Sequence, residues 1–238
     1  MLITGLIYCV IVCFVVPLGG LVLCARRKKG VGKAFFVGAA AFVVSQICVR
    51  IPILQLVLPQ YAWFAIMQLN PWKYGLFLGL SAGIFEEVAR WVCIRFLMKE
   101  QRTLAHGLAF GMGHGGIEAM IFVGINVVVC LGMLLGGQGA LLPLGPWDAF
   151  LAGGERLYAI GFHVGATLLV LKGIRAGKAL RYLISAIILH GLLDAAIVIL
   201  PGVYGVGQMG VWLYGALAGV LTLAAGLICI RKTECQKK

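Results

Sequence analysis

Ionisable side chains that could perform acid–base or metal chemistry are concentrated in the apolar parts of this chain. The chain has eight acidic residues and four histidines, and all four histidines lie within or at the ends of long apolar segments. A charged side chain at the centre of a bilayer costs at least about 2.5 kcal/mol on insertion scales, so such a residue usually marks a functional site. We therefore expect chemistry or proton movement at the acids in the same segments, which are Glu86, Glu87, Glu118, Glu155 and Asp194.

Three apolar segments carry these residues at helical spacing. Glu86 and Arg90 are four residues apart and share one face of a helix, whereas Glu87 points about 100° away. This spacing predicts that Arg90 neutralises and orients Glu86. The same four-residue interval separates Phe110, His114 and Glu118 on a second segment, and His190 and Asp194 on a third.

The composition predicts that helices in lipid must position these groups. The chain has 238 residues, of which 62% are hydrophobic and only 12% charged, and its mean hydropathy is +1.03. A soluble core of this size would not need so much apolar sequence. The net charge of +12 comes from short Lys and Arg clusters between apolar runs, so it indicates membrane topology and not nucleic-acid binding.

Apolar runs of about 20 residues predict an all-α, polytopic membrane helical bundle of about seven transmembrane helices. We expect a single integral-membrane domain over 1–238, with a catalytic core at about 74–200. The expected spans are 2–24, 34–58, 74–98, 104–126, 149–171, 181–200 and 209–230.

The distribution of basic residues predicts the orientation of the bundle. Clusters around Arg26, Lys99, Lys172 and Arg231 follow every second span, and the intervening loops carry no Lys or Arg. By the positive-inside rule, the N-terminus is outside and the C-terminus cytoplasmic. The first span is followed directly by basic residues and lacks a basic leader, so we expect it to remain in the mature protein.

Depth along the helices predicts that the groups meet. Counted from the cytoplasmic ends at about 1.5 Å per residue, Glu86 lies roughly 18 Å deep, His114 roughly 15 Å and His190 roughly 14 Å. His163 falls at roughly 13 Å on the same count, in this layer or at its border. Spans three to six are therefore expected to wall one polar cavity near the bilayer midplane.

The order of these motifs resembles a known pattern. A Glu-Glu pair followed by Arg, then Phe-x-x-x-His, then His-x-x-x-Asp, is similar to the CAAX prenyl protease and bacteriocin-immunity (ABI) superfamily of glutamic-type intramembrane proteases. Within that superfamily the chain most resembles the bacterial YhfC family, which implies a multi-pass protein of the bacterial cytoplasmic membrane. The resemblance rests on residues 85–91, 113–119 and 190–194, together with Glu155-Arg156 and Phe162-His163.

The resemblance implies a peptidase that acts on a membrane-embedded or lipid-anchored peptide. In it, Glu86 is the base that activates water, His114 shares in holding that water, and His190 with Asp194 stabilises the oxyanion. Two departures from the superfamily pattern are the position of Arg90, one residue early, and Asp194 in place of the common Asn. The supporting residues are Glu87, Arg90, Phe110, Glu118, Glu155 and His163.

A metal-dependent version of this peptidase is an open alternative. Two imidazoles, His114 and His190, with a carboxylate from Glu86, Glu118 or Asp194 would leave a position for water on zinc. The chain has no HExxH motif, which would make zinc the stronger interpretation. We therefore rank a glutamic mechanism without a cofactor first, and a zinc site built from Glu86, His114 and His190 second.

Other interpretations of these residues also stand. The buried acids and histidines could form the relay of a proton-coupled transporter, or belong to a non-catalytic scaffold. Glu155-Arg156 could be an internal ion pair or bind substrate, and Arg50, Glu87 and Glu118 could satisfy one another. We expect His106 at the membrane interface, Ser81 inside a helix where a G-x-S-x-G match has no meaning, and Gly107, Gly111 and Gly115 at a close helix contact.

Overall fold

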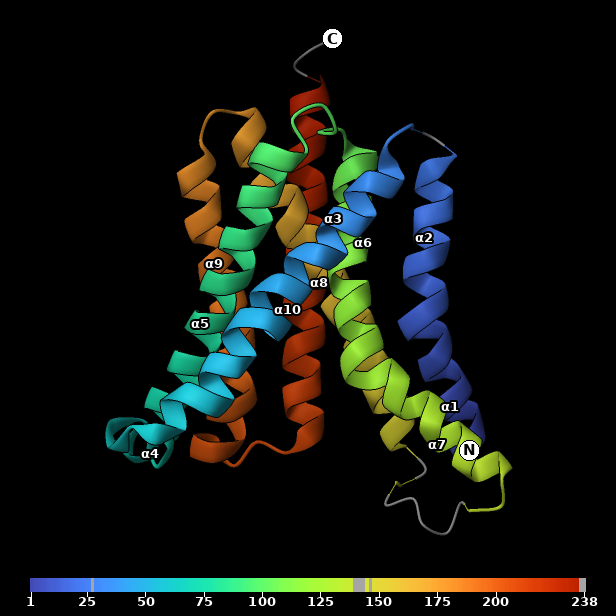
Figure 1. Cartoon of the computed structure of the whole chain (residues 1–238), viewed down its shortest axis with the longest axis vertical. Coiled ribbons are helices and arrows are strands. Elements are labelled where there is room, and N and C mark those ends of the chain that lie inside the picture. Colours follow the sequence, from blue (N-terminus) through green and yellow to red (C-terminus); the bar gives the residue numbers. More distant parts are fainter. Residues whose placement is uncertain (27, 139–143, 146, 236–238) are drawn as a thin grey trace.

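Helices account for nearly all of the part of the chain that the structure describes. The computed structural model describes residues 1–26, 28–138, 144–145 and 147–235, and no strand occurs among them. Figure 1 shows the resulting bundle. The α-helices are α1 (Leu2–Val10), α2 (Val16–Ala25), α3 (Val31–Phe42), α4 (Ala62–Gln68), α5 (Pro71–Val92), α6 (Leu104–Ala119), α7 (Ile125–Leu135), α8 (Asp148–Arg175), α9 (Ala179–Tyr204) and α10 (Gln208–Cys235).

Short wider or tighter turns join several of these helices into continuous rods. Five are π-helical and one is a 3₁₀ turn, and the π-helical form is frequent at functional sites. The turns are η1 (Ile11–Val15), η2 (Val43–Arg50), η3 (Ile53–Val57), η4 (Leu58–Gln60, the 3₁₀ turn), η5 (Cys93–Leu97) and η6 (Met120–Gly124).

The predicted membrane helical bundle is confirmed. In the described residues, six rods are long and apolar enough to cross a membrane, namely Leu2–Ala25, Val31–Gln60, Leu104–Leu135, Asp148–Arg175, Ala179–Tyr204 and Gln208–Arg231. The rod formed by α5 and η5 has a similar length but carries Glu86, Glu87 and Arg90 in its centre. The count of seven spans and the orientation in the membrane stay predictions.

The bundle has two chemically different ends. In Figure 1 the connections from α2 to α3, from η5 to α6 and from α8 to α9 lie at the upper end with the last turn of α10; we call this the basic end. The connection from α9 to α10, residues 205–207, lies at the lower end with the N-terminus; we call this the turn end. Among the basic clusters, Arg27, Lys237 and Lys238 lie outside the described residues.

Glycines allow the central helices to approach closely. A methyl group on Gly38 would overlap the Phe110 carbonyl, and one on Gly113 would overlap the Phe35 carbonyl, so α3 and α6 cross in backbone contact. The predicted role of the α6 glycines is confirmed, because Gly107, Gly111 and Gly115 all face α8.

The largest apolar core fills the half of the bundle nearest the basic end. Its members come mainly from α3, η5, α6, α8 and α10, with one residue each from α2 and α9, and all of them are buried. They include Phe35, Ile94, Met98, Phe110, Leu168, Leu171 and Ile230. This core adjoins the polar site described next, on the side of the basic end.

Candidate active site

Helices α5 and α9 bring the first and third predicted segments together. Gly79 and Gly83 of α5 face the backbone of Gly191 and Ile187 on α9, so no side chain separates the two helices. Ser81, between these glycines, lies inside α5 and donates its hydroxyl hydrogen to the Leu78 carbonyl at 3.0 Å. Its environment is that of a helical serine and not of an exposed nucleophile, as expected.

Glu86 is held by two side chains that contact its two carboxylate oxygens. Gln46 Nε2 donates to Oε1 at 2.6 Å, and His114 Nε2 lies 2.9 Å from Oε2. A carboxylate only accepts hydrogen bonds when ionised, so His114 donates in this pair. Glu86 is buried, yet it lines a cavity of about 290 Å³, so its remaining lone pairs are directed at that space.

Two imidazoles beside Glu86 are each fixed from behind by a carboxylate. His190 Nδ1 lies 2.9 Å from Glu87 Oε1, and His163 Nε2 lies 2.6 Å from Glu118 Oε2. Each contact fixes the tautomer, because the nitrogen that faces a carboxylate carries the hydrogen. The other nitrogen of each ring keeps its lone pair.

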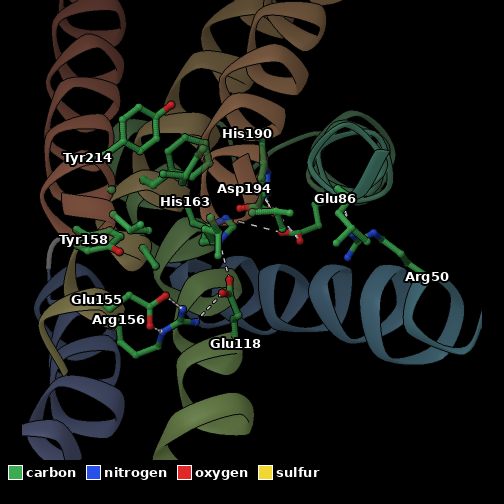
Figure 2. Close-up of a pocket in the computed structure, with 18 residues that line it drawn as sticks. Arg50, Glu86, Glu118, Glu155, Arg156, Tyr158, His163, His190, Asp194 and Tyr214 are labelled. Atoms are coloured by element: carbon green, nitrogen blue, oxygen red, sulfur yellow. Dashed lines mark hydrogen bonds and ion pairs between the residues drawn. The ribbon is translucent and has the colours of Figure 1, made fainter. Parts of the chain in front are cut away.

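Those lone-pair nitrogens converge on Glu86. His190 Nε2 is 3.8 Å from Glu86 Oε1, and His163 Nδ1 is 3.9 Å from Glu86 Oε2. Ligand atoms of the three residues all lie within 4.8 Å of one another. Figure 2 shows His163 and Glu86 joined across the cavity wall, with Glu118 on the far side of the imidazole.

Arg90 does not pair with Glu86, and that prediction is wrong. Its Nε donates to Glu87 Oε2 at 2.8 Å and its Nη2 to Glu87 Oε1 at 3.1 Å. Four-residue and three-residue spacing both bring helical side chains together, and here the three-residue pair forms. Arg90 also bonds the Thr167 hydroxyl at 2.5 Å, so Glu87 and Arg90 build a buried polar anchor between α5 and α8.

Arg90 additionally contacts the site from behind. Its Nη2 lies 3.0 Å from His163 Nδ1, the nitrogen that also faces Glu86. A ligand that binds this nitrogen must therefore displace one contact of Arg90, which keeps its two bonds to Glu87.

Asp194 lies on the cavity wall at the predicted level. Its Oδ2 is 3.7 Å from His190 Nε2, and the side chain is one-third exposed, whereas Glu86 and Glu118 are more deeply buried. No hydrogen bond holds it within the described residues. Asp194 is therefore the acid best placed to exchange protons with a bound molecule.

A second polar cluster lines the same cavity toward the turn end. Arg156 donates to Glu118 at 2.7 Å and pairs with its neighbour Glu155 (Figure 2). Of the two interpretations of Glu155-Arg156, the structure shows the internal ion pair. Both residues also face the cavity. Glu118 links this cluster to His163, so the predicted mutual contact of Arg50, Glu87 and Glu118 is wrong.

Gln46 is a site residue that the sequence reasoning missed, and Arg50 was expected only as a structural ion-pair partner. Both lie on η2, where Arg50 Nη1 donates to Gln46 Oε1 at 3.0 Å and Arg50 Nη2 donates to the Leu78 carbonyl at 2.7 Å. Arg50 thereby orients the amide that holds Glu86, and it lines the cavity. Their four-residue spacing inside an otherwise apolar span was the signal that could have identified them.

The remaining predicted residues have supporting positions. Phe110 is fully buried and stacks on His114, with ring centroids 6.3 Å apart. His106 forms a capping box with Thr103 at the start of α6 and its Nε2 lies 3.0 Å from the Lys29 carbonyl, so its role is structural. The predicted layer of Glu86, His114, His163 and His190 is assembled as expected.

The donor set fits a zinc ion. Ligands of a tetrahedral zinc bound at about 2.0–2.1 Å stand about 3.4 Å apart, close to the separations of His163 and His190 from Glu86. Metal-binding histidines almost always donate their other N–H to a carboxylate or carbonyl, as both rings do here. The set differs from the expected one, because His163 takes the place of His114, which contacts Glu86 instead.

Comparisons with known proteins agree with a metal site. Residues 12–213 match the model of the family described as YhfC intramembrane metalloprotease. The uncharacterized membrane protein YhfC of Bacillus subtilis (strain 168) is 33% identical over 210 residues, which cover 79% of this chain and 81% of that protein. No solved structure matches the chain.

These findings replace our ranking of the mechanisms. The family description gives no support to the preference for a cofactor-free site, and membership of the wider CAAX and ABI superfamily stays a prediction. A multi-pass membrane location is supported both by the relative and by the apolar helices. The chain belongs to the YhfC intramembrane metalloprotease family.

Proposed function

We propose that this chain is a zinc-dependent intramembrane peptidase whose metal is held by Glu86, His163 and His190. The observation that carries the proposal is the paired arrangement of the imidazoles. Each ring is fixed by a carboxylate, Glu118 or Glu87, and turns its other nitrogen toward Glu86. Two imidazoles and one carboxylate form a common zinc ligand set in hydrolases and leave one position open.

The residues around this set have distinct tasks. Gln46 and His114 hold the two oxygens of Glu86 so that its carboxylate keeps one orientation in the cavity. When bound, the metal supplies Lewis-acid polarisation of the scissile carbonyl and activation of water at neutral pH. The protein positions both reactants on the cavity side of Glu86, away from the buried core.

Asp194 is the proton carrier of the proposed reaction. Hydrolysis of a peptide bond needs a base that takes a proton from water and an acid that gives one to the leaving amine. Asp194 is partly exposed in the cavity and lies next to His190, so it can perform both steps in turn. Glu118 is less suited, because His163 and Arg156 already occupy its carboxylate.

The glutamic mechanism makes a different use of the same atoms. It needs a proton on His190 Nε2, so that this nitrogen donates to the oxyanion, and it makes Glu86 the base. Metal binding needs the lone pair of the same nitrogen. The two mechanisms are therefore mutually exclusive at His190, and a test of metal dependence separates them.

The proposed substrate is a membrane-embedded or lipid-anchored peptide, and the setting is the bacterial cytoplasmic membrane. A relay for proton-coupled transport needs a polar path through the bundle. The cavity ends instead at the buried apolar core of the basic end, which favours hydrolysis in a closed site.

Cleavage and metal content of the same preparation test the proposal. Protein purified in detergent is incubated with a library of membrane-anchored peptides, with and without a chelator, and its zinc is measured by elemental analysis. We expect near-stoichiometric zinc, loss of cleavage on chelation and recovery when zinc is restored. Cleavage by metal-free protein would establish the glutamic mechanism instead.

The histidine variants sharpen this test. His163→Ala and His190→Ala are expected to lose zinc and activity together. His106→Gln, which removes a histidine from the start of α6 and not from the site, is the matched control and should keep both. Full zinc content in both site variants would contradict the proposed ligand set.

A further inference from the structure

The residues that line the cavity lie on one side of the metal-ligand level. On α8 they run from Glu155 to His163, and on α9 from His190 to Val198. Helix α8 runs from the turn end to the basic end, and α9 runs in the opposite direction. On both helices the cavity therefore extends from the histidine toward the turn end.

The other helices give the same direction. On α6 the cavity reaches Glu118, one helical turn beyond His114 toward the turn end. On α10 its lining residues lie within the first two to three turns after Gln208, at Val211, Tyr214 and Gly215.

The next helical turn on the basic side is closed at every one of the four site residues. Four residues from Glu86, His114, His163 and His190 in that direction, the side chains have 0% exposure. These four plugging residues are Arg90, Phe110, Thr167 and Ala186. Arg90 and Thr167 are joined by a hydrogen bond, and the apolar core continues behind them.

A second cavity continues the first one to the turn end. It shares four lining residues with the first cavity, and it reaches Val206 and Gln208 at the connection between α9 and α10. The shared residues are Glu155, Tyr158, Ile197 and Val211. The second cavity, and the part of the first that adjoins it, lie between α8, α9 and α10. Its walls carry polar groups along the way, so water can fill it.

We infer that water and substrate reach the site only from the turn end, through the space between α8, α9 and α10. By the predicted orientation, this is the side opposite the basic, cytoplasmic loops. The route for water is independent of the proposed function. The statement that a peptide uses the same route, and so presents its scissile bond from this side, rests on the proposed function.

Labelling of single added cysteines tests the route. All variants carry Cys235→Ser, and the chain with this substitution alone gives the background labelling. No native cysteine lines either cavity. Ala159→Cys probes the depth of the cavity and Val211→Cys its mouth. A membrane-impermeant charged maleimide is added to sealed vesicles of each orientation. Gln208→Cys and Lys178→Cys, both at exposed positions, report the turn end and the basic end.

We expect Ala159→Cys and Val211→Cys to react from the same side as Gln208→Cys, and not from the side of Lys178→Cys. Leu213→Cys is the matched control, because it is two residues from Val211 on the same helix but 57% exposed on the outer face of the bundle, where lipid would cover it. It should stay at background. Labelling of Ala159→Cys from the Lys178 side, from both sides or from neither would overturn the inference.

Cleavage after labelling then tests the peptide route. A bulky maleimide on Val211→Cys is expected to abolish peptide cleavage while zinc content is unchanged, whereas treated Leu213→Cys should retain its activity. Full activity of the labelled Val211→Cys protein would overturn the peptide route. Failure of the proposed function would give a different result. The protein would cleave no peptide in any variant but would still show the expected labelling pattern.

Discussion

The two halves of this bundle use buried polar groups in opposite ways. Toward the basic end, Glu87 and Arg90 are fully buried and bond each other. Their remaining polar contacts are filled by His190, Thr167 and His163. Toward the turn end, Glu86 and Asp194 face a cavity and keep free lone pairs. Adjacent residues on one helix thus have different tasks, because a rotation of about 100° separates the packed side of α5 from its cavity side. Glu87 stabilises, and Glu86 is available for chemistry.

Glu86→Gln is the substitution with the largest expected effect on the cavity side. Gln has the same shape but lacks the charge that holds the metal, so cleavage should fall by at least about 10²-fold, the scale of a lost acid–base group. Peptide cleavage by purified protein measures this loss. Glu100→Gln, at an exposed position near the basic end, is the control and should be unchanged. Retained activity in the Glu86 variant would contradict the assignment of Glu86 as a residue of the active site.

Glu87→Gln tests the packed side. It leaves the Arg90 charge buried without its partner, and loss of one partner from a buried ion pair costs about 3–5 kcal/mol. Thermal unfolding in detergent should show a large decrease in stability. The double variant Glu87→Gln with Arg90→Met removes both charges and should be more stable than the single variant. Equal stability of Glu87→Gln and Glu86→Gln would erase the contrast between the two residues.

Glu118→Gln separates metal binding from fold stability. Glu118 accepts the N–H of His163, and loss of such a supporting carboxylate typically weakens metal binding by about 10–100-fold. Zinc titration against a competing chelator measures the change. Glu155→Gln removes a carboxylate that contacts Arg156 but no histidine, so its zinc affinity should match that of the unmodified protein. The same loss in both variants would point to a general effect of charge.

Gly113→Ala tests the close crossing of α3 and α6 with the smallest expected effect. A methyl group there would overlap the Phe35 carbonyl, and overpacking of this kind costs about 1–3 kcal/mol. The free energy of unfolding measures it. Gly32→Ala meets no atom within 4 Å and should be neutral or slightly stabilising, since alanine favours helix over glycine. Two neutral variants would show that the crossing tolerates a side chain.

The sequence predicts the layer of the site but not its partners. Equal depth on separate helices placed Glu86, His114, His163 and His190 together, because a straight helix rises by a fixed length per residue. Depth cannot tell which of two neighbouring acids Arg90 contacts, since that depends on how α5 rotates against α8. It also cannot rank His163 against His114 as a metal ligand. The structure favours His163, because Glu118 holds its far nitrogen, whereas His114 contacts Glu86 itself.

The contact of Gln46 with Glu86 could not be predicted by the same reasoning from depth. Gln46 is uncharged, so no cost of burying a charge drew attention to it. Its position against Glu86 arises from the π-helical turn η2 and from the tilt of α3 across the bundle, visible in Figure 1. Neither feature has a clear signature in an apolar sequence.

The ligands of a bound metal are the most direct test of the proposed site. Zinc K-edge absorption spectroscopy of the purified, zinc-loaded protein reports the number of imidazoles in the first coordination shell. We expect two imidazoles with oxygen ligands in the unmodified protein. In His163→Ala we expect most of the zinc to be lost and any residual zinc to have one imidazole ligand. Zinc with no imidazole ligand, or an unchanged spectrum in His163→Ala, would contradict a metal site at Glu86, His163 and His190.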